Sequence, residues 1–206
     1  FPSPNTLPEN AQNTFDSVQV LDAVAQFPQV PAVLLNEVNN GVPDWVELYN
    51  PTSSSVDLSQ WWLRWGDANG QTGYVQLAGL TLPANGYRVV SDGALSPPSP
   101  GLVLSTNLPW YPQRAGSATL LDPYGIPTDY VRWQSLSYQT FPDEPPAGTT
   151  FMGWGIGFDA PVANRTLSRD VNSTDTDTQY DWSLNGPTPA ARNETVAVDA
   201  SWVLYE

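Results

Sequence analysis

Acidic side chains late in the sequence form the best candidate for chemistry. Four aspartates alternate with threonine and other polar residues within one segment: Asp170, Asp175, Asp177 and Asp181. Side-chain oxygens spaced along a loop can wrap Ca²⁺, which accepts flexible oxygen sites. The segment lacks the central Gly and final Glu of the helix-loop-helix calcium loop. Asp and Thr also bond local backbone, so a capped turn without metal is the alternative.

The residues that most enzymes use for catalysis are missing. The chain has no Cys, no His and no Lys, and its seven positive charges are all Arg. Thiol chemistry, the usual general base and zinc ligand, and Schiff-base catalysis are therefore absent. Asp143 and Glu144 stand between prolines in an expected exposed loop, and neighbours on an extended chain point apart. We predict that the chain is not an enzyme.

The charge of the chain limits its partners. The formal net charge is −14 and the isoelectric point is about 4.1, which repels nucleic acid and anionic lipid surfaces. No apolar run is long enough to cross a bilayer, so we expect no membrane insertion. Position 1 is Phe rather than Met, which suggests that a secretion signal has been removed. We expect a secreted protein, extracellular or at a cell surface.

Aromatic side chains are a second candidate for binding. Trp62 points away from the face that carries Trp61, and the pair Trp110 and Tyr111 lies between prolines. Such rings can stack on sugars or contact another subunit. The alternative is ordinary packing, since aromatic side chains are commonly buried.

Three sequons are candidates for glycosylation. They begin at Asn164, Asn172 and Asn193. A chain with this content of Asn, Ser and Thr has roughly two by chance, so the motifs alone establish no modification.

Hydrophobic alternation with period two predicts an all-β fold. Short apolar stretches alternate with turn residues, and useful helical periodicity is missing from the middle of the chain. The expected strands are 34–38, 45–49, 61–65, 74–77, 87–90, 118–121 and 129–133. Asp67 to Gly70 reads as a turn, because Asn-Gly readily adopts positive φ.

The two ends differ from the middle and define three regions. Residues 1–30 are expected to be an extended N-terminal arm, since the first thirteen include three prolines; part of this region is ambiguous between helix and strand. Residues 31–194 form the expected β-sandwich. Residues 195–206 are expected to form a C-terminal strand, because the apolar residues alternate strictly: Val196, Val198, Ala200, Trp202 and Leu204.

A series of motifs in one order resembles the lamin tail domain family. The motifs are VLLNEV at 33–38, DWVELYNP at 44–51, VDLSQW at 56–61, LTLPANGY at 80–87, GSATLLD at 116–122 and DYVRW at 129–133. TLSR at 166–169, TDTDT at 174–178, DW at 181–182 and PTP at 187–189 resemble the ending of prokaryotic members. The resemblance implies an immunoglobulin-like β-sandwich without catalytic residues, often used as an extracellular module.

The recurring residues are expected to be structural. Trp45, Tyr49 and Trp61 are rings that can fill the space between two sheets, next to Leu63. Glu47 is expected to accept hydrogen bonds from loop backbone or from an arginine such as Arg64.

The expected function is structural. We predict a cell-surface or filament subunit that assembles through its terminal strand and open sheet edges, with itself or another surface protein. The alternative is a monomeric adhesion or ligand-binding module of a larger secreted protein, specific for carbohydrate or protein.

Overall fold

A computed structural model describes residues 32–112, 114–133 and 165–194. The chain divides into two compact units, Phe1–Val30 and Pro31–Glu206. All the described residues belong to the second unit.

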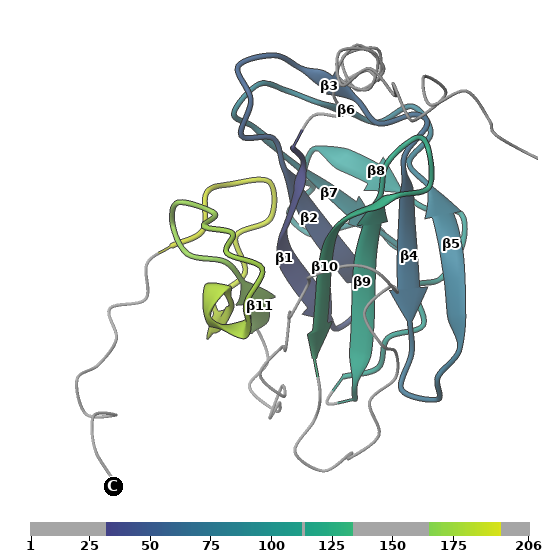
Figure 1. Ribbon diagram of the computed structural model, residues 1–206. Helices are drawn as coiled ribbons and strands as arrows, with labels where there is room; N and C mark the ends of the chain where they lie inside the picture. Colours follow the sequence, from purple (N-terminus) through teal and green to yellow (C-terminus); the bar gives the residue numbers. More distant parts are fainter. Residues whose placement is uncertain (1–31, 113, 134–164, 195–206) are drawn as a thin grey trace, which may run out of the picture. The chain divides into compact units, whose positions relative to one another are not determined.

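The larger sheet of this unit has six strands in the order β12-β11-β1-β2-β7-β8 (Figure 1). Their bounds are β1 (Leu34–Asn40), β2 (Asp44–Tyr49), β7 (Tyr87–Ser91), β8 (Gly101–Val103), β11 (Thr166–Ser168) and β12 (Ser183–Asn185). Neighbours are antiparallel except β7 and β8, which run parallel. Residues far apart in the sequence thus share one sheet, because β11 pairs with β1.

The smaller sheet has four strands in the order β10-β9-β4-β5 and packs against the larger one (Figure 1). Their bounds are β4 (Trp62–Gly66), β5 (Thr72–Gln76), β9 (Gly116–Leu121) and β10 (Pro127–Trp133). A two-stranded ribbon joins β3 (Val56–Asp57) to β6 (Thr81–Leu82). The architecture is a β-sandwich, and the all-β prediction is confirmed.

Side chains that alternate inward from both sheets form the core. The fully buried apolar residues include Leu35, Val38, Val46, Leu48, Leu63, Val90, Ala118, Leu120 and Val131. Burial of each large aliphatic side chain contributes about 1.5–3 kcal/mol. Trp61 and Trp133 are also buried, with 2% and 1% of their surface exposed. Gly116 leaves room for the Trp133 ring, since a Cβ there would lie 2.4 Å from it.

Three of the residues expected between the sheets lie elsewhere. Val46 and Leu48 face the core, so Trp45, Glu47 and Tyr49 alternate to the outer face of the six-stranded sheet. Tyr49 stacks there on its cross-strand neighbour Tyr87, with ring centroids 4.7 Å apart. The expectation that Trp45 and Tyr49 fill the space between the sheets is therefore corrected.

The strands expected in the described part of the chain are present, with bounds shifted by a few residues at most. The predicted turn after Asp67 closes with a hydrogen bond from Gly70 N to Asp67 O of 3.1 Å, and Gly70 has a φ of 78°. The short strands β3, β6, β8, β11 and β12 were not predicted, since two or three residues carry too little alternation. Within the described residues one short 3-10 turn, η2 (Gln179–Asp181), is the only helical element. No helix in that part of the chain has the length and apolar character needed to cross a membrane.

Candidate functional site: a polar junction beneath the strap

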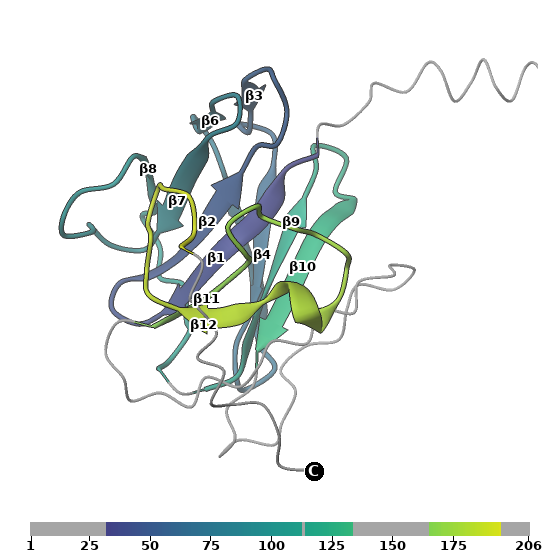
Figure 2. The same cartoon turned by 90° about the vertical axis from the view of Figure 1, so that its left-hand side faces the viewer.

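Residues 186–194, here called the strap, follow β12 and cross the outer face of the six-stranded sheet over β1 and β2 (Figure 2). A loop on a sheet face leaves backbone polar groups that need partners. Buried polar side chains of β1 and β2 supply those partners, and they form what we call the polar junction.

A β-bulge in β1 brings the polar side chains together. The register shifts between Leu35 and Glu37, so that Asn36 is the extra residue beside the Glu37–Glu47 pair. Asn36 Nδ2 donates to Glu47 Oε1 at 2.7 Å. Asn36, Glu37 and Glu47 are all fully buried.

Glu37 accepts hydrogen bonds from two segments that follow later in the chain. Thr166 Oγ1 on β11 donates to Glu37 Oε1 at 2.5 Å. The strap residue Thr188 donates from N to Oε1 at 3.1 Å and from Oγ1 to Oε2 at 2.9 Å. One carboxyl group therefore connects β1, β11 and the strap.

Glu47 and Asn193 complete the attachment of the strap. Ala190 N donates to Glu47 Oε2 at 2.5 Å, so the expected partner from loop backbone is present. Arg64, the other expected partner, belongs to β4 in the opposite sheet. Asn193 Nδ2 donates to Arg169 O at 2.9 Å and to Asn36 O at 3.3 Å. The strap is thus fixed by side chains at both of its ends.

Burial dominates the electrostatics of this glutamate pair. Burial raises the pKa of Glu47 to about 9, together with a smaller contribution from the charge of the neighbouring Glu37 and against hydrogen bonds from Asn36, Ala190 and Ala191. Burial also raises the pKa of Glu37, opposed by its bonds to Thr166 and Thr188. Two adjacent buried carboxyls disfavour double ionisation. With its pKa of about 9, Glu47 is the group of the pair that holds a proton at neutral pH.

Arg169, one residue beyond β11, is a second buried hub. Its side chain is 1% exposed and pairs with Asp129 of β10, with Nη2 3.1 Å from both carboxylate oxygens. Nε donates to Leu35 O of β1 at 2.7 Å. The same Asp129 accepts from Leu35 N at 2.7 Å. Arg169 and Asp129 therefore join the two sheets along the edge where β1 meets β10.

The loop after Arg169 folds back onto its guanidinium. Nη1 lies 2.9 Å from Asp175 Oδ1 and 3.5 Å from Asp181 Oδ2. The Trp182 ring lies against the same group, 4.7 Å from the ring centroid to Cζ, which is a cation–π contact. Burial raises the pKa of Asp129 to about 7, and the charge of Arg169 opposes that rise.

Three of the four aspartates considered for calcium have other partners. Asp175 and Asp181 pair with Arg169, and Asp181 Oδ2 also accepts from Thr176 N at 2.7 Å. Asp170 caps the turn through Thr174 N at 2.8 Å. Burial raises the pKa of Asp177, followed by the charge of Asp175. No group of three or more acidic side chains in the described residues has the arrangement of a metal site, and the calcium site stays a prediction.

A second pair of acids anchors the segment before β9. Asp44 Oδ2 accepts from Trp110 N at 3.1 Å, and Asp92 Oδ2 accepts from Leu108 N at 3.1 Å. Burial, and then the charge of Asp92, raise the pKa of Asp44 to about 9. This pair holds Trp110 in the interior.

Of the candidate binding aromatics, Trp110 is buried. It is 4% exposed, donates from Nε1 to Gly66 O at 3.1 Å and packs edge-on against Trp133, 5.0 Å between centroids. The packing alternative therefore describes Trp110, and its expected role in surface binding is corrected. Trp62 and Tyr111 are 36% and 52% exposed.

The sequons have different environments. Asn172 is exposed, whereas Asn193 is 2% exposed and its amide is used in the polar junction. The expectation that Asn193 is a surface acceptor is corrected accordingly. Asn164 lies outside the described residues.

The polar junction connects segments of the same chain to one another. The carboxyls of Glu37, Glu47 and Asp129 accept hydrogen bonds from backbone or side chains of the same chain and are closed to solvent. A buried carboxyl in this state positions a segment and has no substrate within reach. Sequence reasoning missed Glu37, Asp129 and Arg169 as partners. Their signal was the presence of charged residues inside otherwise apolar strand motifs.

The profile of the lamin tail domain matches residues 27–135, just over half of the chain. This chain belongs to the lamin tail domain family. The family consists of non-enzymatic, immunoglobulin-like structural domains, in agreement with the sandwich described above. A search of curated proteins finds no match to the chain. The match includes β1 to β10, while β11, β12 and the strap of this lamin tail domain follow it.

Proposed function

We propose that this lamin tail domain is a non-enzymatic structural subunit that acts outside the cell and assembles with further copies by pairing of strands at its sheet edges. The observation that carries the proposal is the difference between the closed and the open edges of the sandwich. An edge strand with free backbone groups is a template for another strand.

On one side of the sandwich the edge strand β10 of the smaller sheet is tied to β1 within the chain, and the larger sheet ends in the three-residue strand β12. There β10 lies against β1, and Arg169 and Asp129 bind both strands. On the other side, β5 and β8 are the last strands of their sheets. Each carries an exposed apolar side chain, Tyr74 at 60% and Val103 at 60%. These edges are the places where the described fold is able to accept a strand.

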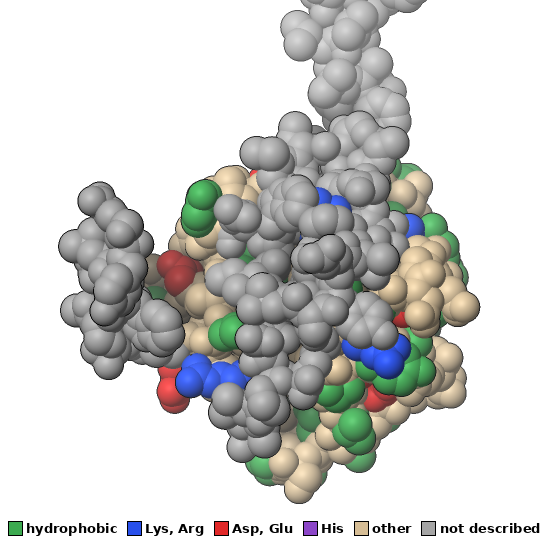
Figure 3. Space-filling view, turned by 90° about the horizontal axis from the view of Figure 1, so that it is seen from below, with side chains coloured by type: hydrophobic (Ala, Val, Ile, Leu, Met, Phe, Trp, Pro, Cys, Tyr) green, Lys and Arg blue, Asp and Glu red, His purple; other side chains and the backbone are tan. Residues whose placement is uncertain are grey.

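The net charge and the composition of the described surface support a protein that stays in solution beside other anions and assembles through uncharged contacts. The net charge of −14 disfavours contact between charged surfaces of like copies. On the end of the sandwich seen in Figure 3, the described surface mixes hydrophobic and uncharged polar atoms with separate charged side chains. Backbone pairing at an edge needs no charge.

Electron microscopy and light scattering of the purified full chain test the proposal. We expect polymers or defined oligomers that grow with protein concentration. A chain that remains monomeric at all concentrations in both measurements contradicts an assembly function.

A second candidate function rests on the outer face of the four-stranded sheet. Trp62 pairs with Gln76 and Arg64 pairs with Tyr74, which places all four side chains on one face. The exposed rings of Trp62 and Tyr74 suit stacking on a sugar. Binding on a glycan array that is lost in Trp62→Ala supports this accessory-module function, and no binding removes it.

A further inference from the structure

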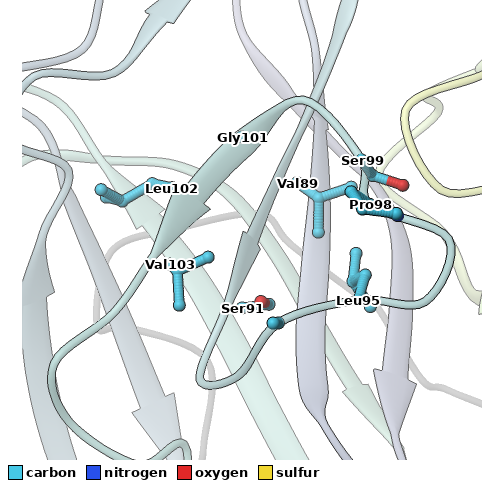
Figure 4. A pocket seen from close by; sticks show the side chains of 9 residues that line it. Val89, Ser91, Leu95, Pro98, Ser99, Gly101, Leu102 and Val103 are labelled. Carbon is cyan, nitrogen blue, oxygen red and sulfur yellow. The ribbon is translucent and has the colours of Figure 1, made fainter.

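A small apolar pocket lies beside the edge strand β8 (Figure 4). Its volume is about 120 Å³, and its walls include Val89 of β7, Leu102 and Val103 of β8, and Leu95 and Pro98 of the intervening loop. An apolar cavity of ~150 Å³ holds benzene, so this pocket has room for one apolar side chain.

The β8 backbone is pressed against β7, and no strand of the described residues lies on its other side. A Cβ on Gly101 would lie 1.8 Å from Val89 O, which explains the glycine. Val89 N donates to Pro100 O at 3.1 Å and Leu104 N donates to Ser91 O at 2.7 Å. Backbone groups alternate in direction along a strand, so those of Gly101 and Val103 point away from β7. An incoming strand can pair with them.

The charge of the site suits a second copy of this acidic chain. None of the residues that line the pocket is charged. Like-charge repulsion between copies is therefore small at this uncharged edge, where the incoming segment 196–205 carries a single charge, that of Asp199.

The chain carries a segment with the pattern that such a site requires. Residues 196–205 place Val196, Val198, Ala200, Trp202 and Leu204 at alternate positions. A strand with this pattern presents one continuous apolar face while its backbone pairs at the edge. One side chain of that face fits the pocket.

The position of the strap favours exchange between copies. Asn193 is fixed on β1, and β2 and β7 separate β1 from β8, a lateral distance of roughly 14 Å at normal strand spacing. To reach β8 of its own chain, the segment must cross these strands and then bend along the edge. The turn-forming residues of 195–206 are Asp199 and Ser201, and both lie within the alternating pattern rather than before it.

We infer that residues 196–205 of one copy add as a strand to β8 of a second copy and place an apolar side chain in the pocket of Val89, Leu95 and Leu102. This inference rests on the proposed function and names its partner and its edge. The donor segment and the acceptor edge β8 are different surfaces of the chain, so copies associate head to tail. Repeated head-to-tail contacts build open filaments or rings.

In the full-length chain, two substitutions that introduce a glutamate test the acceptor edge and the donor segment separately. Val103→Glu alters the acceptor edge, where the side chain is already exposed and folding is preserved. Trp202→Glu alters the apolar face of the donor. Ile126→Glu, an equally exposed aliphatic position in the turn between β9 and β10 and away from both open edges, is the matched control. We expect each of the first two variants to raise the concentration needed for assembly at least tenfold, and the control to assemble like the unmodified chain.

A mixture of the two blocked variants distinguishes two cases. Either residues 196–205 pair with β8 of another copy, or they fold back onto β8 of their own chain. The Val103→Glu copy keeps a working donor and the Trp202→Glu copy keeps a working acceptor. An equimolar mixture should form heterodimers, seen by light scattering, and no polymer. A mixture that stays monomeric overturns the inference, as does normal assembly of Val103→Glu. Normal assembly of Val103→Glu would leave the proposed assembly function intact and show only that β8 is the wrong edge. An unmodified chain that stays monomeric would contradict the proposed function as well.

Discussion

Glu37 and Glu47 lie opposite each other across the β1–β2 ladder, and both are fully buried beneath the strap. Two neighbouring carboxylates on a covered sheet face are destabilising, because each ion loses its hydration and repels the other. The compensation comes from donors on Asn36, Thr166 and the strap. The sheet face and the strap therefore depend on each other for stability.

This pair should make folding stability fall with rising pH. In the folded chain the pKa of Glu47 is about 9, against an ordinary value of 4.5. The folded state thus binds more protons than the unfolded state between these pH values, and the free energy of unfolding decreases as pH rises through that window. Asp44, with a folded pKa of about 9, acts in the same direction. We expect a loss on the order of a few kcal/mol in urea unfolding across the window.

The substitution Glu47→Gln isolates the contribution of Glu47. A glutamine side chain does not titrate, so the pH dependence should be shallower than in the unmodified chain. Glu194→Gln, at the exposed last residue of the strap, is the control and should leave the slope unchanged. An identical slope in Glu47→Gln contradicts the assignment of the proton to this pair.

Removal of the Arg169 side chain should be among the most damaging single substitutions. Arg169→Met leaves Asp129 buried without its counter-charge, and the loss of one partner of a buried ion pair costs about 3–5 kcal/mol. Arg165→Met is the matched control, because Arg165 is exposed and, among the described residues, makes one hydrogen bond of 3.3 Å, to Leu184 O. Surface changes of this kind stay within about 0.5 kcal/mol. Equal effects of the two substitutions in urea unfolding would contradict the role of Arg169 as the joint between the sheets.

The fold was largely predictable from alternation, and the polar junction was not. Strand 45–49 was identified correctly, but period two gives two faces without saying which one meets the other sheet. Trp45 and Tyr49 were assigned to the inner face because large rings usually fill a core. The structure covers the outer face with the strap, so that both faces are buried and the usual signal of a polar outer face is lost.

Long-range pairing explains the other omissions. Arg169 meets Asp129 across a separation of 40 residues and Glu37 meets Thr188 across 151. No local spacing encodes such contacts. Burial of Trp110 depends on Asp44 and Gly66, which are 66 and 44 residues away in the sequence.

Gly101 should tolerate no side chain. In Gly101→Ala the new Cβ collides with Val89 O, so β8 must move away from β7. Overpacking against backbone costs typically 1–3 kcal/mol, which should lower the thermal unfolding midpoint by several degrees. Gly186→Ala is the control, because no heavy atom lies within 4 Å of the added Cβ. A Gly101→Ala chain as stable as this control would show that β8 is not held in the described register.

Calcium should have no stabilising effect at the aspartate-rich loop. Asp175 and Asp181 already neutralise the guanidinium of Arg169, and a divalent cation beside that group would be repelled. Addition of CaCl₂ to about 10⁻³ M, the range of weak extracellular sites, should leave the unfolding midpoint unchanged. Asp175→Asn should destabilise the chain equally with and without calcium. A calcium-dependent rise in the midpoint that Asp175→Asn abolishes would instead establish the metal site.

Glycosylation should distinguish Asn172 from Asn193 when the chain is secreted by a glycosylating host. A glycan replaces a hydrogen of Nδ2, and in Asn193 this nitrogen donates to Arg169 O and Asn36 O in a buried position. Asn172 is exposed and has room for a sugar. Peptide mass spectrometry of the folded protein should therefore find modification at Asn172 and none at Asn193. The substitution Asn193→Gln should leave the intact glycan mass unchanged and lower stability by about 1–3 kcal/mol, because buried partners lose their hydrogen bonds. A glycan on Asn193 in folded protein would mean that the strap is not seated on β1.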